Sequence, residues 1–114
     1  SAASTQRTSS PAARCIATVG MGNALRAGDP PGPTARIGTI NLVCRVSVPL
    51  TDEALLEALA LAAEARGLAV HESGIASTVS GLPASGTGTD CIVIAAPLVY
   101  LLSWRSAWEL GAPD

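Results

Sequence analysis

The stretch PASGTGTDCIVIAAP, residues 83–97, places two Gly-Thr steps and an aspartate directly before an apolar run. Its glycines permit a close backbone approach by a ligand, its threonines offer hydroxyl groups, and Asp90 offers a carboxylate. The residues match neither G-x-G-x-x-G nor G-x-x-x-x-G-K-S/T, and they lead into a predicted strand instead of a helix. The pattern therefore argues against a nucleotide-binding loop. It leaves two interpretations open, a polar binding loop or an ordinary turn that Asp90 caps.

Other residues with catalytic potential are sparse. His71 is the only histidine and the sequence has no G-x-S-x-G motif, so a Ser-His-Asp triad is disfavoured. Cys15, Cys44 and Cys91 are widely spaced, and each lies in an apolar run without a C-x-x-C motif. This pattern is typical of buried, reduced thiols, and we expect no metal site.

The composition narrows the class of protein. Hydrophobic residues make up 48% of the 114 residues and aromatic residues only 3%, so we expect an aliphatic core. The net charge is −2 and the seven cationic residues are scattered arginines, which argues against a nucleic-acid surface. No apolar signal segment is visible near the start, and Pro97 breaks an apolar segment too short to span a bilayer. We therefore expect a cytoplasmic protein with no membrane partner.

The first half of the chain predicts two strands. Residues 1–13 are predicted to form a disordered lead-in, followed by a short strand over 14–20 and a long loop rich in glycine and proline. Residues 38–48 then alternate as a strand does, with apolar side chains on one face and Thr39, Asn41 and Arg45 on the other. That polar face is either exposed to solvent or part of a site.

The second half predicts a long helix from Asp52 to Glu72, with Thr51 as its N-cap and Gly74 as its stop signal. Gly67 interrupts the helix, which is consistent with a close approach by another element. Residues 75–81 are a candidate strand, and 91–96 form an apolar strand typical of burial on both faces. The apolar stripe of the helix is predicted to contain Leu55, Leu56, Leu59, Ala62 and Ala63. We therefore expect an α/β fold in which strands and one long helix form a layered, aliphatic-core domain, incomplete in this chain.

Four segments together resemble one known family. ATVGMGNALRAGDP, GTINLVCRVSVPLTDEAL, AAEARGLAV and PASGTGTDCIVIAA, in this order and at this spacing, are similar to segments of the adenosylcobinamide amidohydrolases, the CbiZ family. The resemblance covers residues 15–96. Where the family has Thr-Glu-Ala-Lys, this chain has AEAR, which keeps Glu64 and replaces the lysine with Arg66. Ala-Thr before the Gly-Thr repeat is here Ala84-Ser85.

The resemblance implies a hydrolase that cleaves the amide joining aminopropanol to a corrin propionate, giving adenosylcobyric acid in corrinoid salvage. It implies a corrinoid as substrate and no cofactor, and it leaves a homo-oligomer open. Amide hydrolysis needs an activated water or nucleophile, donors for the developing oxyanion and a proton for the leaving amine. We expect Asp90 and Glu64 to be the catalytic carboxylates, one as general base and the other as orienting group, and we rank Cys91 lower as a nucleophile.

A substrate fringed with carboxamides favours amide and hydroxyl partners, which we expect to gather in a pocket at one edge of the sheet. The predicted substrate-binding residues are Asn23, Thr39, Asn41, Gly86, Thr87, Gly88 and Thr89. Three of the predicted site residues have an alternative structural role: Glu64 as an exposed helix charge, Asp90 as a turn cap, and Asn23 as a turn residue with positive φ.

The ends of the chain depart from the family pattern. The family is about twice as long, so we expect a missing N-terminal portion. Residues 97–114, PLVYLLSWRSAWELGAPD, replace a Gly-Lys-His-Thr-like segment, and we interpret them as an atypical tail produced by a frameshift or an artificial end. A corrinoid-binding module without turnover and an inactive fragment therefore remain alternative functions.

Overall fold

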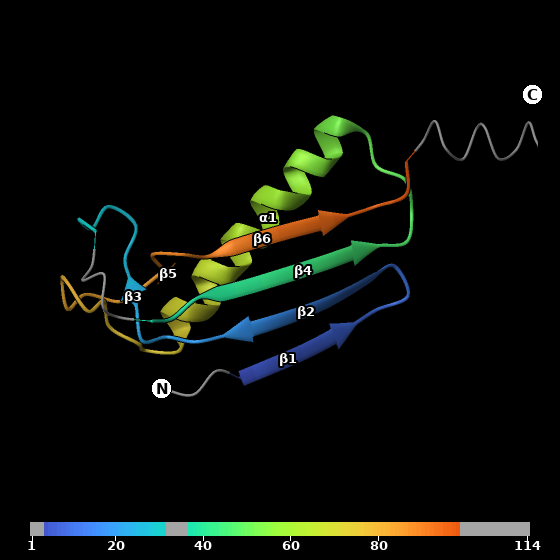
Figure 1. The fold of residues 1–114 in the computed structure, drawn as a ribbon. Coiled ribbons are helices and arrows are strands. Elements are labelled where there is room, and N and C mark those ends of the chain that lie inside the picture. Colours follow the sequence, from blue (N-terminus) through green and yellow to red (C-terminus); the bar gives the residue numbers. More distant parts are fainter. Residues whose placement is uncertain (1–3, 32–36, 99–114) are drawn as a thin grey trace, which may run out of the picture.

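The computed structural model describes residues 4–31 and 37–98, and within them the fold is α/β (Figure 1). Four strands form the main sheet in the order β1-β2-β4-β6, and β3 pairs with β5 in a small second sheet. One long helix, α1, packs against one face of the main sheet (Figure 1). The elements are β1 (Ser4–Ser9), β2 (Ala13–Val19), β3 (Ala24–Leu25), β4 (Ile40–Val46), α1 (Asp52–Glu72), β5 (Gly86–Thr87) and β6 (Cys91–Ala95).

The predicted disorder of residues 1–13 is wrong for the part that the structure describes. Ser4–Ser9 forms β1, an edge strand that pairs antiparallel with β2 along its whole length. Its side chains are all exposed, so composition gave no sign of it. The strand forms because backbone hydrogen bonds to β2 do not require apolar side chains, and because a short turn at Ser10–Ala13 joins the two strands.

Strand β4 confirms the predicted alternation. Its burial changes from residue to residue, and Ile40 is only 4% exposed, whereas Asn41, Val43 and Arg45 face solvent. β4 pairs antiparallel with β2 and parallel with β6, so α1 is the crossover of a β4-α1-β6 unit. The layered α/β arrangement is thus confirmed.

Helix α1 begins and ends where its signals predict. The Thr51 hydroxyl accepts a hydrogen bond from the Ala54 N–H at 3.1 Å, which satisfies one of the free donors of the first turn. Asp52 and Glu53 lie in that first turn, where the helix dipole favours negative charge. Gly74 has a φ of +76°, so the chain leaves the helix through a conformation that glycine adopts without strain.

The predicted apolar stripe of α1 is confirmed in part, because Leu55, Ala62 and Ala63 are half-buried. Leu56 and Leu59 are exposed, and of the predicted stripe only Ala62 lines the space facing the sheet. The helix is apolar on most sides, so its periodicity did not identify the packed face. The residues of α1 and its C-cap that line this space are mostly small, with two large side chains among them: Ala58, Leu61, Ala62, Ala65, Arg66, Ala69, Val70 and Ser73.

An apolar groove of about 590 Å³ lies between this face of α1 and the main sheet. Cys15, Ala17 and Val19 of β2 and alternate residues of β4 line its floor. Alanines on the helix leave the groove open, because they reach less far toward the sheet than leucines would. Among the described residues that line it, Arg66 alone carries a charged group.

Strand β6 differs from the prediction of burial on both faces. Ile92 and Ile94 face the helix side and are half-buried, whereas Cys91 and Val93 are exposed. β6 lies at the edge of the sheet, and α1 covers one face only (Figure 1). An apolar sequence therefore marked a strand correctly but not its degree of burial.

Residues 75–81 form a turn instead of the predicted strand. Ser77 is buried, and its hydroxyl donates to Asp29 and accepts from the N–H groups of Val79 and Ser80. A single bridge between Ala76 and Pro83 closes the turn. Serine hydroxyls compete with regular backbone pairing in this way, which is why a threonine- and serine-rich stretch did not become a strand.

The helix of the described residues is not apolar enough over its length to cross a membrane.

Substitution by alanine is expected to have opposite effects on the free energy of unfolding at Gly38 and at Gly67. A Cβ at Gly38 would lie 2.7 Å from the backbone N atoms of Gly22 and Asn23, so Gly38→Ala should lower the free energy of unfolding by roughly 1–3 kcal/mol. A Cβ at Gly67 meets only the Ser85 carbonyl, at 3.7 Å, which is ordinary contact. Gly67→Ala should therefore stabilise the helix by up to about 1 kcal/mol. Urea unfolding measures both, and equal effects would contradict the packing described for Gly38.

The surroundings of Asp29 predict how the thermal stability of the protein depends on pH. Its carboxylate accepts hydrogen bonds from Ser77 and from the Arg26 N–H, and these hold the pKa of Asp29 below its ordinary value of 3.8. Because this pKa is lower in the folded than in the unfolded protein, ionised Asp29 stabilises the fold at pH values above the unfolded pKa. That stabilisation is lost as the pH falls through the folded pKa. Asp29→Asn should therefore flatten the loss of thermal stability between about pH 5 and pH 3. An unchanged pH profile of the melting temperature would contradict this role.

Candidate functional site

The candidate site lies at the end of the main sheet where β4 and β6 begin (Figure 1). There, β3 pairs with β5, with Ala24 opposite Thr87 and Leu25 opposite Gly86. This pairing joins the long loop after β2 to the Gly-Thr loop before β6. Two segments about sixty residues apart in the sequence thus form one loop cluster.

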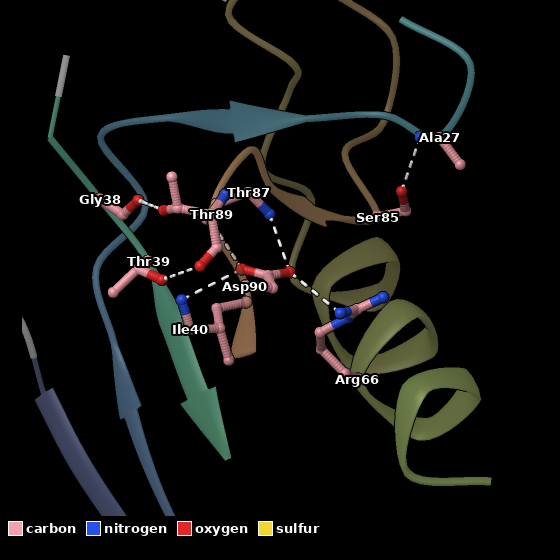
Figure 2. Close-up of polar contacts among 9 residues, drawn as sticks. All are labelled: Ala27, Gly38, Thr39, Ile40, Arg66, Ser85, Thr87, Thr89 and Asp90. Atoms are coloured by element: carbon pink, nitrogen blue, oxygen red, sulfur yellow. Dashed lines mark hydrogen bonds and ion pairs between the residues drawn. The ribbon is translucent and has the colours of Figure 1, made fainter. Parts of the chain in front are cut away.

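Asp90 lies at the centre of this cluster (Figure 2). Its side chain is only 8% exposed. Oδ1 accepts from the Ile40 N–H at 3.1 Å and from the Thr87 hydroxyl, and Oδ2 accepts from the Thr87 N–H at 3.0 Å. A carboxylate has about four lone-pair positions, and these three donors occupy most of them.

Arg66 supplies the fourth contact of Asp90. Its Nη1 lies 3.2 Å from Oδ2 of Asp90, and the guanidinium reaches the cluster from α1 (Figure 2). The Arg66 Nε is buried without a hydrogen-bond partner among the described residues. The ion pair compensates the burial of the carboxylate, and it fixes the second half of α1 against the Gly-Thr loop.

Two threonines join the Gly-Thr loop to the start of β4. The Thr39 hydroxyl donates to the Thr89 carbonyl at 2.7 Å, and the Thr89 hydroxyl donates to the Gly38 carbonyl at 2.8 Å (Figure 2). This reciprocal pair uses both hydroxyl protons, so each of these oxygens offers only acceptor positions to a ligand. The two threonines therefore act first as loop clamps.

Close packing explains the glycines of the Gly-Thr loop. A Cβ on Gly86 would collide with Oδ2 of Asp90, and a Cβ on Gly88 would lie 2.9 Å from Nδ2 of Asn23. Asn23 is itself only 8% exposed. Any side chain at either glycine would displace a polar group of the cluster. The glycines thus serve a close approach within the protein, in addition to any approach by a ligand.

The structure brings most of the predicted binding residues together. Asn23 has a negative φ, because no non-glycine residue of the described ranges has a positive one, so the alternative of a left-handed turn residue is wrong. The predicted residues that meet in the loop cluster around Asp90 are Asn23, Thr39, Gly86, Thr87, Gly88 and Thr89.

Two predicted site residues lie elsewhere. Asn41 projects from the opposite face of β4, where it is exposed and donates to the Thr18 hydroxyl at 3.2 Å. Glu64 is exposed on α1. Because successive helical residues are about 100° apart, Glu64 and Arg66 project in very different directions, and Arg66 is the one directed at Asp90. Cys91 is exposed and shares the face of Asn41, its partner in β4.

Sequence reasoning missed Arg66 as a member of the cluster. The available signal was its position in AEAR, where the family pattern has lysine, since both residues place a cation there. Helical periodicity did not identify it, because α1 is apolar on most sides and the residues that line the groove are mostly alanines. Within the described residues, no group of three or more His, Cys, Asp or Glu side chains is arranged to hold a metal ion.

Comparison with known proteins places this sequence in a family. The model of the adenosylcobinamide amidohydrolase family, CbiZ, matches residues 1–100 of the 114. The chain belongs to the adenosylcobinamide amidohydrolase family. The family match begins before the predicted lead-in ends and continues to residue 100, whereas residues 99–114 lie outside the described residues.

A curated relative of this CbiZ-family chain is the uncharacterized protein MJ1613 of Methanocaldococcus jannaschii. The two are 41% identical over 63 residues, which is 54% of this chain and 25% of MJ1613. The chain thus matches about a quarter of the length of that relative. None of the solved structures matches it.

Replacing Asp90 tests its central position in this CbiZ-family loop cluster. Asp90→Asn removes the negative charge opposite Arg66 and turns one acceptor oxygen into a donor that faces other donors. We expect the free energy of unfolding to fall by about 2–4 kcal/mol. Asp52→Asn at the exposed helix start is the matched control, with an effect of up to about 1 kcal/mol. Equal effects of the two variants would contradict the geometry.

Proposed function

We propose that this chain carries the amide-hydrolysing site of an enzyme that cleaves the aminopropanol amide of adenosylcobinamide, giving adenosylcobyric acid in corrinoid salvage. Membership in the adenosylcobinamide amidohydrolase family carries the proposal. The geometry adds a loop cluster in which a buried carboxylate, a hydroxyl and the guanidinium of Arg66 meet, and Arg66 also lines the groove. The substrate is a corrinoid, and no cofactor is part of the proposal.

Thr87 is the group that we propose to attack the substrate amide. Its hydroxyl donates to Oδ1 of Asp90, and its oxygen accepts from the Thr89 N–H at 3.3 Å. A hydroxyl has two lone pairs, so one remains for the carbonyl carbon of a substrate. A nucleophile within hydrogen-bond reach of a base, with the base held by a third group, is the arrangement that covalent catalysis uses.

Asp90 then accepts the Thr87 proton and returns it to the departing nitrogen of aminopropanol. Four donors surround the Asp90 carboxylate, so it has no free position for an external water. Its contribution therefore passes through Thr87. Arg66 balances the carboxylate charge before the transfer. Acylated Thr87 no longer donates to Oδ1, so a water can take that position, lose a proton to Asp90 and attack the ester. The proton then returns to the Thr87 oxygen as the cobyric acid leaves.

The other predicted roles remain proposals. Asn23, Gly86 and Gly88 lie within the cluster, where amide and backbone groups suit a carboxamide-fringed ring. For Glu64, exposed on α1, we retain a catalytic role only if a partner surface covers that side of the helix. Asn41 contacts the same ring only if the ring extends past the edge of the sheet.

The decisive assay incubates the chain, and separately a full-length relative, with adenosylcobinamide. Adenosylcobyric acid is followed by mass spectrometry and binding by equilibrium dialysis. Product above a no-protein background is the expected result for the full-length relative. Its failure to form product would overturn the proposed function.

Variants of a full-length relative at the matching positions then assign roles. At Thr87, we expect replacement by alanine to lower kcat/KM by at least about 100-fold, and replacement by serine to retain activity within about 10-fold. Asp90→Asn should abolish turnover. Glu64→Gln, compared with Glu57→Gln on the same helix, tests the second carboxylate. Wild-type rates in the Thr87→Ala or Asp90→Asn variant would remove that residue from the mechanism.

A second function, corrinoid binding without turnover, is favoured by one observation. The two carboxylates predicted to act together are separated, because Asp90 is enclosed by its donors and Glu64 is exposed elsewhere. In addition, the chain matches a quarter of the length of the relative, and under this second function other segments of the full-length protein supply the groups that turnover requires. Saturable binding of adenosylcobinamide by this chain with no product would identify this function, and neither binding nor product would identify an inactive fragment.

A further inference from the structure

Cys15 and Cys44 lie face to face across neighbouring strands, away from the loop cluster. Cys15 of β2 is directly opposite Cys44 of β4 in the antiparallel register. The Cys15 thiol donates to the Cys44 sulfur, with the two Sγ atoms 2.9 Å apart. Both side chains face the apolar groove and are half-buried.

The hydrogen-bond pattern of β2 and β4 shows which kind of pair the two cysteines form. The Gly20 N–H donates to the Thr39 carbonyl, and the Ser47 N–H donates to the Ala12 carbonyl, each at 2.9 Å. These two facing pairs are therefore hydrogen-bonded pairs, and hydrogen-bonded and non-hydrogen-bonded pairs alternate along an antiparallel ladder. Counting inward from either end makes the cysteine pair a non-hydrogen-bonded one.

This pair type has the separation that a disulfide needs. Facing Cα atoms in non-hydrogen-bonded pairs are about 4.5 Å apart, and disulfides join Cα atoms about 4.4–6.8 Å apart. The sulfur atoms are already closer than a van der Waals contact, and only they need to move to reach the bonded distance of about 2.0 Å. The strands can thus keep their register.

We propose that Cys15 and Cys44 form a redox-active dithiol, which a low-molecular-weight disulfide converts into an intramolecular disulfide between β2 and β4. One cysteine thiolate attacks the reagent disulfide and forms a mixed disulfide, releasing one reagent thiol. The second cysteine attacks the protein sulfur of that mixed disulfide and releases the other reagent thiol. The two cysteines lose two electrons and two protons, and the reagent gains them as two thiols.

The environment of Cys44 determines its role in this exchange. Burial, and to a smaller extent the hydrogen bond with Cys15, raises the pKa of the Cys44 thiol to about 12. Because the thiolate is the attacking species, Cys44 is a poor first nucleophile. Cys15 therefore attacks the reagent first, and Cys44 resolves the mixed disulfide because its Sγ lies only 2.9 Å from that of Cys15, a proximity that offsets its low thiolate fraction.

Cys91 provides an internal control. It is exposed, and its pairing with Asn41 places it on the face of the sheet opposite the two paired cysteines. It therefore reacts with a reagent disulfide independently of them, and it cannot join their bond without unfolding of the sheet.

Peptide mapping tests the proposal. The reduced protein is treated with oxidised glutathione, alkylated, and digested with trypsin without reductant. Cleavage after arginine puts Cys15 in the peptide 15–26 and Cys44 in the peptide 37–45. The expected product is these two peptides joined, with a mass two hydrogens below their sum. Cys91→Ser should give the same product, whereas Cys15→Ser and Cys44→Ser should abolish it.

Two outcomes would overturn the proposal. One is glutathione attached to the cysteines singly with no joined 15–26 and 37–45 peptide. The other is a joined peptide whose formation requires prior denaturation. As an independent measurement, the oxidised Cys91→Ser protein should melt at least about 5 °C above its reduced form, because the bond closes a loop between the two strands. An equal or lower melting temperature would show that the bond does not fit the native sheet.

Discussion

The buried carboxylate of Asp90 is the interaction on which the loop end of this molecule depends. A charge at this depth is costly unless donors surround it, and its donors come from three separate parts of the chain. The Ile40 N–H belongs to β4, Thr87 belongs to the Gly-Thr loop, and Arg66 belongs to α1. Satisfying one charge therefore forces the strand, the loop and the helix into one relative position. The same requirement explains why Gly86 lacks a side chain, since a Cβ there would meet the carboxylate.

The electrostatics of the cluster also limits the chemistry that it performs. A carboxylate saturated with donors is well held and poorly available to solvent, so any proton that it moves must come from a group already bound to it. Among its partners, only the Thr87 hydroxyl has a proton and an open lone pair. Position and reactivity are thus set by the same contacts, and a structural role for Asp90 does not compete with a catalytic one.

Sequence patterns predicted the elements better than their surroundings. The alternation in β4, the Thr51 cap and the Gly74 stop are local signals, and the structure confirms them. Apart from residues 75–81, where serine hydroxyls form a turn, the wrong predictions concern what an element packs against. Strand β1 forms only because β2 offers a pairing edge, and β6 is half exposed because α1 covers one face. The packed side of α1 was identified only in part, because alanines contribute little to the hydrophobic periodicity of a helix.

The candidate site was predictable only in part, because local sequence signals identify its loops but not the direction of the side chains on α1. The Gly-Thr loop and Asn23 were recognisable as polar, flexible segments, and β3–β5 pairing brings them together. The sequence could not show whether Glu64 or Arg66 of α1 faces Asp90. The two residues are only two positions apart, and their directions depend on how α1 is rotated against the sheet. A helix with apolar residues on most sides does not specify that rotation, whereas the ion pair with Asp90 does.

Strand β4 connects the loop cluster and the cysteine pair. Its first N–H binds Asp90, and Cys44 lies four residues further along the same strand, about 13 Å away at the usual rise per residue. With reduced cysteines, only hydrogen bonds and packing hold this stretch of β4 against β2, beside a groove that alanines leave open. A bond to Cys15 would restrain the strand from its middle, while Asp90 restrains it at its start. The two restraints would then act on one short strand, and the new bond would contact none of the side chains that hold Asp90.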